Sequence, residues 1–364
     1  MTKRNNFFQV RNSIRSLMIP LLILALLVSS CTGNKTELYH HMDKIDAHVH
    51  IRTADPALME YAASEGFKLL TINTRSNSQE YIDSQKEYAM KMKSLYPNEI
   101  SWLATFSMEN FEEAGWADGV IRKLQEDLDQ GASGFKIWKD IGMTFQDSLG
   151  SFVLLDDPLF EPVLAFMEAS GLPLLTHIGE PLNCWLPLDS MTVNGDKSYF
   201  TNHPEYHMYL HPDYPSHERL MQSRDHVLAT YPRLKMIGAH LGSLEWDVDV
   251  LAERLDRYPN FAVDMAARVC HFQVQERDKV RDFILKYQGR ILYATDLGVS
   301  EENVEDRIQW LQNEWKSDWR YFATDSLMNS RNVEGEFMGL DLDREVLEKI
   351  YYSNALKWYS GIFE

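Results

Sequence analysis

Histidines and an aspartate stand at the ends of short apolar segments in this sequence. The first such segment contains Asp46-Ala47-His48-Val49-His50. Alternate side chains of a β-strand point to the same face, so Asp46, His48 and His50 are expected to point the same way. Two imidazoles spaced in this manner can reach one metal ion. A histidine or an aspartate also ends three later apolar segments, at His177, His240 and Asp296.

One histidine in an apolar segment is more often a hydrogen-bonded core residue than a ligand. Burial of this many titratable groups without a function, however, would cost considerable desolvation free energy. Lys136 adds a further ionisable group, late in another apolar segment. The set therefore predicts a metal site with nitrogen and carboxylate ligands, provided that the segment ends converge.

The spacing of apolar segments indicates how they converge. Short apolar, β-branched or aromatic runs alternate with longer amphipathic stretches, which is typical of a parallel sheet covered by helices. The runs span residues 44–51, 68–73, 101–107, 133–138, 172–178, 235–241, 260–265 and 290–295. Helices are predicted at 79–95, 116–130, 158–170, 216–231, 248–258 and 277–287. Eight strand–helix units predict an α/β fold, a (β/α)₈ TIM barrel whose strand ends meet at one mouth, with a doubly wound open sheet as the alternative.

Residues 179–215 interrupt this rhythm between the fifth strand and its helix. The stretch is rich in aromatic residues and contains five prolines: Pro181, Pro187, Pro204, Pro212 and Pro215. Long loops in compact domains are usually functional. We expect a long lid loop after strand 5 that also forms a substrate wall, with a structural flap or an oligomer contact as the alternative.

The composition excludes some classes of protein. The 364 residues are 45% hydrophobic and 25% charged, which is typical of a globular chain. A net charge of −18 argues against nucleic-acid binding, because such proteins must neutralise phosphates. Neither Cys184 nor Cys270 belongs to a C-x-x-C pair, so two separate buried thiols are expected rather than a disulfide or a cysteine metal site.

The N-terminus has the pattern of a secretory signal. A basic region without acids is followed by an apolar run at 17–28 and by Ser29-Ser30-Cys31. This ending resembles a bacterial lipobox, in which the cysteine is lipidated. We therefore expect residues 1–30 to be a signal peptide, 31–43 a tether lipidated at Cys31, and 44–364 the barrel domain. An exported envelope lipoprotein is implied, and Thr32 favours the outer membrane; an uncleaved anchor is the alternative.

Six motifs together resemble the amidohydrolase superfamily, in particular its amidohydrolase-related branch of lactone hydrolases and metal-dependent non-oxidative decarboxylases. They are IDAHVH, GFKIW, LLTHIGEP, MIGAHLGS, FAVDMAAR and ILYATDLG, one on each of six predicted strands. The resemblance extends over residues 44–360. It is specific for the superfamily and says little about the substrate.

The resemblance implies a role for each site residue. The metal ligands would be His48, His50, His177 and Asp296. His240 would lie beside the metal as an acid or base, and Asp296 would also accept a proton. One Zn²⁺ is favoured, with Mn²⁺ or Fe²⁺ as alternatives; a carboxylated Lys136 would instead bridge two metals.

The expected activity is metal-dependent hydrolysis of an amide, ester or lactone in a small molecule. The alternatives are decarboxylation of a small carboxylic acid and a binding module without activity. Lys136, Glu180 and Arg268 are expected to contact the substrate, which the two cations would favour as an anion. No nucleic-acid partner is expected, the membrane would be contacted only through the N-terminal lipid, and homo-oligomerisation is left open.

Overall fold

The computed structural model describes residues 1–2, 35 and 37–363. Contacts divide the chain into two units, Met1–His41 and Met42–Glu364. The predicted signal peptide, apart from its first two residues, and the predicted lipidation site Cys31 lie outside the described residues. Within the part of the chain that the structure describes, no helix is long and apolar enough to cross a membrane.

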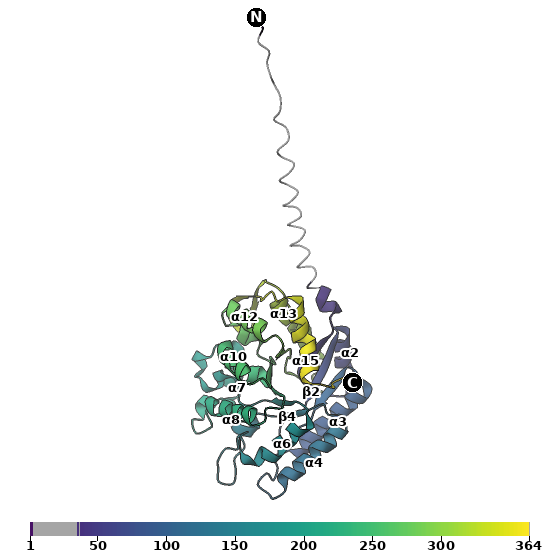
Figure 1. Cartoon of the computed structure of the whole chain (residues 1–364), viewed down its shortest axis with the longest axis vertical. Coiled ribbons are helices and arrows are strands. Elements are labelled where there is room, and N and C mark those ends of the chain that lie inside the picture. Colours follow the sequence, from purple (N-terminus) through teal and green to yellow (C-terminus); the bar gives the residue numbers. More distant parts are fainter. Residues whose placement is uncertain (3–34, 36, 364) are drawn as a thin grey trace. The chain divides into compact units, whose positions relative to one another are not determined.

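The second unit is a (β/α)₈ barrel, as the alternation of segments predicts (Figure 1). Two parallel sheets, ordered β3-β2-β1-β9 and β4-β5-β6-β7-β8, make up its wall. A parallel bridge between Ala104 and Phe135 joins them on one side. On the other side Ala47 N donates to Tyr293 O at 3.0 Å, and Asp296 N donates to His48 O at 3.0 Å. The wall strands are β1 (Lys44–Arg52), β2 (Phe67–Ile72), β3 (Ile100–Leu103), β4 (Phe135–Ile137), β5 (Leu174–Thr176), β6 (Met236–Gly238), β7 (Phe261–Asp264), β8 (Ile291–Leu292) and β9 (Leu297–Ser300).

The predicted eighth strand is divided into β8 and β9. Asp296, which lies between them, has a φ of 67°. Left-handed backbone cannot continue a strand, so β8 pairs with β7 before this residue and β9 pairs with β1 after it.

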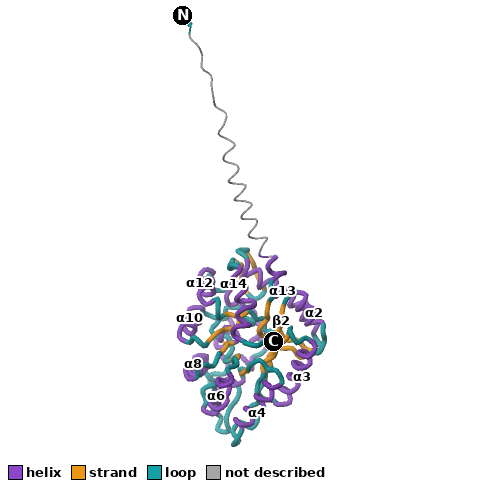
Figure 2. The backbone as a smooth tube through the Cα atoms, turned by 45° about the vertical axis from the view of Figure 1, so that its right-hand side comes forward, coloured by secondary structure: helices purple, strands orange, loops and turns teal. Residues whose placement is uncertain are grey.

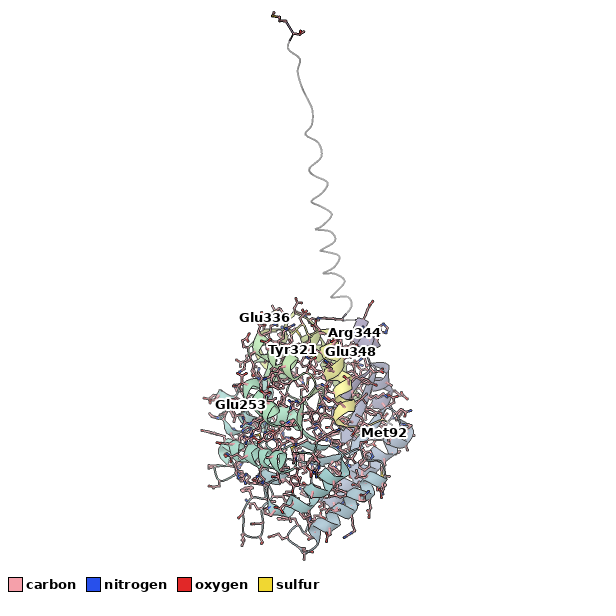
Figure 3. The ribbon with its side chains drawn as sticks, in the orientation of Figure 1. Met92, Glu253, Tyr321, Glu336, Arg344 and Glu348 are labelled. Atoms are coloured by element: carbon pink, nitrogen blue, oxygen red, sulfur yellow. The ribbon has the colours of Figure 1, made fainter. Side chains whose placement is uncertain are left out.

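Helices form the layer outside the strands (Figure 2). They bury one apolar stripe each: α10 begins at the N-cap Asp247 and buries Val248, Leu251 and Leu255, which share one face of the helix. Charged residues occupy the outer surface, where Arg344 and Glu348 of α14 are in contact at 2.7 Å (Figure 3). The outer helices are α2 (Ala57–Ser64), α3 (Gln79–Leu95), α4 (Trp116–Asp129), α6 (Glu161–Ser170), α8 (His217–Thr230), α10 (Val248–Arg257), α12 (Arg277–Tyr287), α13 (Val304–Ala323) and α14 (Arg344–Glu348).

The barrel interior is apolar and is closed by the end of the chain. Ile45, Leu70, Leu175 and Ile237 come from different strands and belong to one buried cluster. The same cluster includes Trp358 and other residues at and after α15 (Asn354–Trp358), which follows η6 (Lys349–Ser353). The opposite end of the barrel is therefore free to carry polar groups.

The expected long loop at 179–215 is instead a series of short helices. Prolines place their starts: Pro181 and Pro187 precede the first two, and Pro204 opens the fourth. The lid role remains a prediction. The segment contains η2 (Leu182–Trp185), η3 (Leu188–Ser190), α7 (Asn194–Asn202), η4 (Pro204–Tyr206) and η5 (Met208–Leu210).

An antiparallel hairpin that the periodicity did not predict lies beside this segment. It consists of β10 (Leu327–Ser330) and β11 (Val333–Met338), and Asn194 N donates to Asn332 O at 2.9 Å. The remaining short helices follow strands at the barrel mouth: α5 (Asp140–Met143), α9 (Ala239–Gly242) and α11 (Val269–Gln273), with η1 (Pro158–Phe160) before α6.

Candidate active site

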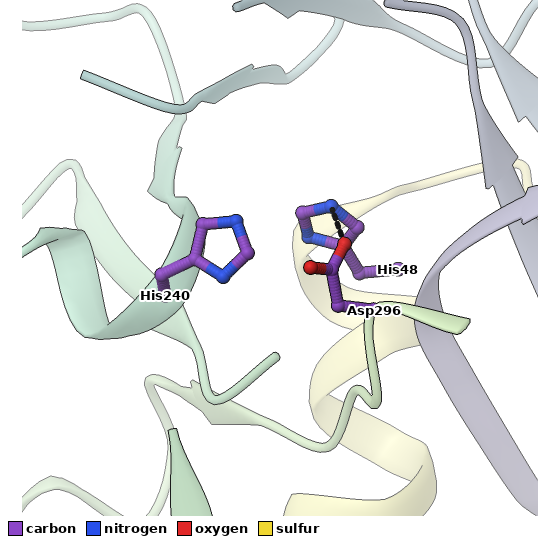
Figure 4. A group of neighbouring side chains, drawn as sticks. All are labelled: His48, His240 and Asp296. Atoms are coloured by element: carbon purple, nitrogen blue, oxygen red, sulfur yellow. Dashed lines mark ion pairs between the residues drawn. The ribbon is translucent and has the colours of Figure 1, made fainter. Parts of the chain in front are cut away.

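His48, His240 and Asp296 form the centre of the site at the barrel mouth (Figure 4). Each offers one ligand atom, and these atoms lie within 4.8 Å of one another. His48 Nε2 is 3.3 Å from Asp296 Oδ1. The three residues come from β1, from α9 after β6, and from the break between β8 and β9. The barrel thus brings together residues that are far apart in the sequence.

Asp46 departs from the expected alternation along β1. The pairing register of this strand shifts between Asp46 and Val49. Asp46 Oδ2 accepts from Trp315 Nε1 of the outer helix α13 at 3.2 Å, whereas His48 contacts Asp264 of β7. The expectation that Asp46 points the same way as the histidines is wrong, because the irregular register breaks the period of two.

Asp264, buried at the end of β7, holds two of the histidines. Its Oδ2 accepts from His48 Nδ1 at 2.8 Å, and its Oδ1 accepts from the backbone N of His240 at 2.8 Å. Burial alone would raise the pKa of Asp264, but the neighbouring His48 outweighs it and lowers the pKa. An ionised Asp264 fixes the proton of His48 on Nδ1.

The same proton arrangement recurs around the site. His240 Nδ1 is 2.8 Å from Ala266 O, and His50 Nδ1 is 3.3 Å from Ile72 O. A carbonyl oxygen only accepts, so each ring donates from Nδ1 and, when neutral, presents the lone pair of Nε2. His50 Nε2 is 3.0 Å from Asp296 Oδ1. Lone pairs of imidazole and oxygens of a carboxylate therefore face each other, and a cation between them would satisfy both.

The protonation states suit a divalent cation. Burial lowers the pKa of His240 to about 3 and lowers the pKa of His50. Burial alone would raise the pKa of Asp296, but the contact with His50 and the closeness of the other histidine rings outweigh burial and lower the pKa. Neutral imidazoles and an ionised carboxylate are the forms that ligate metals, and Zn²⁺ accepts this donor set. The described residues thus fit the metal that the sequence predicts.

His177 stands beside this centre. Its ring centroid is 4.2 Å from that of His240, and its Nε2 is buried with no hydrogen-bond partner among the described residues. Burial lowers the pKa of His177 well below the usual value. A buried nitrogen without a partner is costly, which is consistent with a ligand role. Neither His50 nor His177 belongs to the group of atoms within 4.8 Å.

The backbone that carries His240 is left-handed over four residues. The φ angles of His240, Leu241, Gly242 and Ser243 are 59°, 57°, 63° and 55°. This conformation costs roughly 1–2 kcal/mol for each residue other than glycine. Side-chain contacts hold it: Arg224 donates to Gly242 O, His217 Nε2 donates to Ser243 O at 2.7 Å, and Ser243 Oγ donates to Gly179 O at 2.8 Å. Strain maintained in this way is typical of functional sites.

The three residues expected to contact substrate lie in different surroundings. Lys136 of β4 is fully buried, its Nζ has no hydrogen-bond partner within the described residues, and burial lowers its pKa to about 8. Glu180 contacts Lys139 Nζ and lies 4.0 Å from Arg268 Nη2. Arg268 Nη1 donates to Ala267 O at 3.0 Å, and its buried Nε has no partner among the described residues.

A cavity of about 420 Å³ opens above the metal-binding group. His177, His240 and Asp296 line it, together with Glu180 and Arg268. The segment at 179–215 contributes Pro181, Asp196, Tyr199 and Phe200 to its wall. The cavity brings the candidate metal ligands and two of the expected substrate-binding residues to one space.

Sequence reasoning missed three ionisable residues here. Lys139 lines the cavity and contacts Glu180; its place three residues after Lys136, just beyond the fourth strand, could have identified it. Asp196 Oδ2 lies 3.2 Å from His271 Nε2, between α7 and α11. No local pattern indicates this pair, because its members meet only after the 179–215 segment has folded over the barrel.

Comparison with known proteins agrees with this geometry. A family model described as amidohydrolase matches residues 103–361, which is most of the chain. No protein in a search of curated sequences matches.

Solved structures share the fold at low identity. They include 2,6-dihydroxybenzoate decarboxylase from Rhizobium (15% identity, 87% of this chain and 98% of that chain, TM-score 0.52). They also include a 2,6-dihydroxybenzoate decarboxylase complexed with 2,6-dihydroxybenzoate (16% identity, 87% of this chain and 99% of that chain, TM-score 0.51). A more distant similarity is to 4-oxalomesaconate hydratase from Rhodopseudomonas palustris (12% identity, 87% of this chain and 95% of that chain, TM-score 0.47).

Proposed function

Because the chain belongs to the amidohydrolase family, we propose that it is a metal-dependent hydrolase of a small molecule with an amide, ester or lactone bond. The observation that supports this most is that hydrogen-bond acceptors of two histidines and an aspartate face one another at short distance. Nε2 of His48 and of His50 point at one oxygen of Asp296, at 3.3 and 3.0 Å. His48, His240 and Asp296 would hold the metal, with His50 and His177 beside them.

When bound there, a divalent cation supplies Lewis acidity, which lowers the pKa of water and polarises a carbonyl oxygen. Asp296, kept ionised, orients the attacking water and accepts its proton. His240, which is buried and neutral, would present Nε2 to the metal, because its Nδ1 donates to Ala266 O. Asp264 fixes the orientation of both His48 and His240 while the proton moves.

Decarboxylation of a small carboxylic acid is the second candidate. Arg268 favours it, because its Nε has no hydrogen-bond partner among the residues that the structure describes and because it lines the cavity beside the metal-binding group. A guanidinium can bind a carboxylate through two parallel hydrogen bonds. Two solved structures with this fold are decarboxylases of 2,6-dihydroxybenzoate.

Labelled water separates the two reactions. The metal-loaded protein is incubated in H₂¹⁸O with a panel of lactones, esters, amides and aromatic carboxylic acids, and products are measured by mass spectrometry. Hydrolysis incorporates one ¹⁸O into the product and releases no CO₂, whereas decarboxylation releases CO₂ and leaves the product unlabelled. Asp296→Asn is the inactive control. Absence of bound transition metal in the purified protein, even after reloading with Zn²⁺ or Mn²⁺, would overturn both candidates.

A further inference from the structure

A second cavity of about 390 Å³ lies next to the active-site cavity, and Lys139 lines both of them. Its volume is within the range of small-molecule sites. Lys139 contacts Glu180, which lines the active-site cavity. Lys139 Nζ is also 5.5 Å from the ring of Trp138 and 5.3 Å from the ring of Tyr206, both of which line the second cavity. The Lys139 side chain therefore borders both spaces.

The walls of the second cavity are largely apolar and aromatic. Trp138, Tyr206 and Tyr214 provide rings, and Met143 and Met208 provide flexible apolar surface. Tyr206 is partly exposed, and its ring stacks near that of Tyr199 with centroids 6.4 Å apart. Such walls bind a flat or ring-shaped group through its faces.

The charges that line the same cavity are balanced. Arg75 and Lys139 are cationic, and Asp140 and Glu205 are anionic. A cationic ligand would meet two like charges, and so would an anionic ligand. The balance favours a neutral ligand.

Asp140 indicates that this neutral ligand donates hydrogen bonds. The residue is 5% exposed, and its Oδ1 accepts from Ser76 Oγ at 2.7 Å and from Ile141 N at 3.0 Å. Its Oδ2 is buried and has no hydrogen-bond partner within the described part of the chain. A buried carboxylate oxygen left unpaired is costly, and a purely apolar ligand would not relieve that cost.

We propose that the second cavity binds a neutral, hydroxylated ring of the substrate, of the kind that a pyranoside presents. The apolar faces of such a ring would pack between Trp138, Tyr206 and Tyr214, and a hydroxyl would donate to Asp140. The proposal rests on the proposed function, because it makes this ring the distal part of a molecule whose scissile bond lies beside Asp296. Since Lys139 lines both cavities, the substrate would pass along it.

Binding of methyl glycosides tests the cavity without any turnover. The full-length, metal-loaded protein in detergent is titrated with methyl glucopyranoside, galactopyranoside and xylopyranoside, and with benzoate and butylamine as charged comparators. Saturation-transfer NMR and tryptophan fluorescence report binding. We expect at least one glycoside to saturate, and its affinity to fall about tenfold or more in Tyr206→Ala and in Asp140→Asn. Tyr209→Ala is the matched control, because Tyr209 is exposed on the same segment and lines neither cavity.

Three outcomes would overturn the proposal: no glycoside binds, binding is equal in Tyr206→Ala and the unmodified protein, or a charged comparator binds in place of the glycosides. Metal content is measured on each sample. Failure to bind glycosides with the metal in place contradicts the second cavity alone, whereas a protein that holds no metal contradicts the proposed function.

Discussion

Asp264 serves two histidines of the site at once, and this makes it the residue on which the metal-binding geometry depends most. One of its oxygens accepts from the ring of His48 and the other accepts from the backbone of His240. Partners of metal-binding histidines commonly change metal affinity about 10–100-fold when they are replaced. We expect Asp264→Asn to lower the affinity for Zn²⁺ by this factor, as measured by competition with a chelator of known affinity.

The reason is electrostatic rather than steric. Asparagine has the same shape, but it carries no charge to stabilise the Nδ1 proton of His48. Asp256→Asn serves as the control, since Asp256 pairs with Lys286 at the surface. Equal Zn²⁺ affinity in Asp264→Asn and the control would contradict the role assigned to Asp264.

Asp140 makes a second residue-scale prediction, for stability against pH. Burial raises the pKa of Asp140 from 3.8 to about 6. Between these values the folded state binds more protons than the unfolded state, so this group lowers stability as the pH rises through the window. Relative to Asp140→Asn, the free energy of unfolding of the unmodified protein should therefore fall by about 2 kcal/mol between pH 4.5 and pH 7.5.

Urea denaturation of both proteins across this pH range measures the difference. Subtraction of the two curves removes the contributions of other titrating groups that the proteins share. A difference that does not vary with pH, or that grows in favour of the unmodified protein as the pH rises, would show that Asp140 is ionised at little cost.

At the scale of elements, the left-handed turn of α9 predicts different effects for two glycines. Gly242 has a φ of 63°, and a Cβ there would lie 3.0 Å from Phe261 Cζ and 3.1 Å from Arg224 Nη1. Gly335 in β11 also has a positive φ, of 83°, but a Cβ there would meet nothing within 4 Å. We expect Gly335→Ala to cost about 1 kcal/mol of stability, from the backbone alone.

Gly242→Ala should cost a further 1–3 kcal/mol or so, because it also crowds the core. It should reduce activity as well, since it displaces the turn that carries His240, whereas Gly335→Ala should leave activity unchanged. Chemical denaturation and a rate assay on both variants test this. Equal stability losses would mean that the turn adjusts without strain.

The elements themselves were largely predictable from the sequence, and the reason is physical. Strands buried on both faces read as continuous apolar runs, and α3 at Gln79–Leu95 has the bounds that the periodicity predicts. Features that depend on distant contacts were not predictable. The register shift in β1, the left-handed turn at 240–243 and the break at Asp296 are set by partners such as Asp264, Arg224 and His48.

The same distinction applies to the site. Its histidines and Asp296 stand at strand ends, so a barrel necessarily gathers them at one mouth, and the sequence predicts the set. Which of their atoms meet depends on the irregular backbone, and this is why His240 joins the central group whereas His50 and His177 lie beside it. Asp140 was missed because its significance comes from a cavity that forms only in the folded chain, whereas the position of Lys139 just beyond the fourth strand could have identified it.

At the scale of the whole molecule, the candidate metal site links the two ends of the barrel wall. His48 comes from β1 and Asp296 precedes β9, which pairs with β1 and closes the barrel. A cation held between these residues would bind the folded chain and not the unfolded one. Metal binding should therefore stabilise the whole barrel rather than a local segment.

Removal of the metal should accordingly lower the melting temperature. At a free Zn²⁺ concentration of 100 times the dissociation constant, linkage contributes about 2.7 kcal/mol. For a domain of this size that corresponds to a shift of about 5 °C. Calorimetry of the protein after treatment with a chelator, and again after Zn²⁺ is restored, measures the shift and its reversal.

In Asp296→Asn the shift should be small, because the carboxylate that faces both His48 and His50 is gone. Mg²⁺ should not replace Zn²⁺, because it prefers an octahedral set of oxygen ligands over imidazole. Identical melting temperatures with and without Zn²⁺ would mean that these histidines face Asp296 only as hydrogen-bond partners, and that the barrel is closed without a metal.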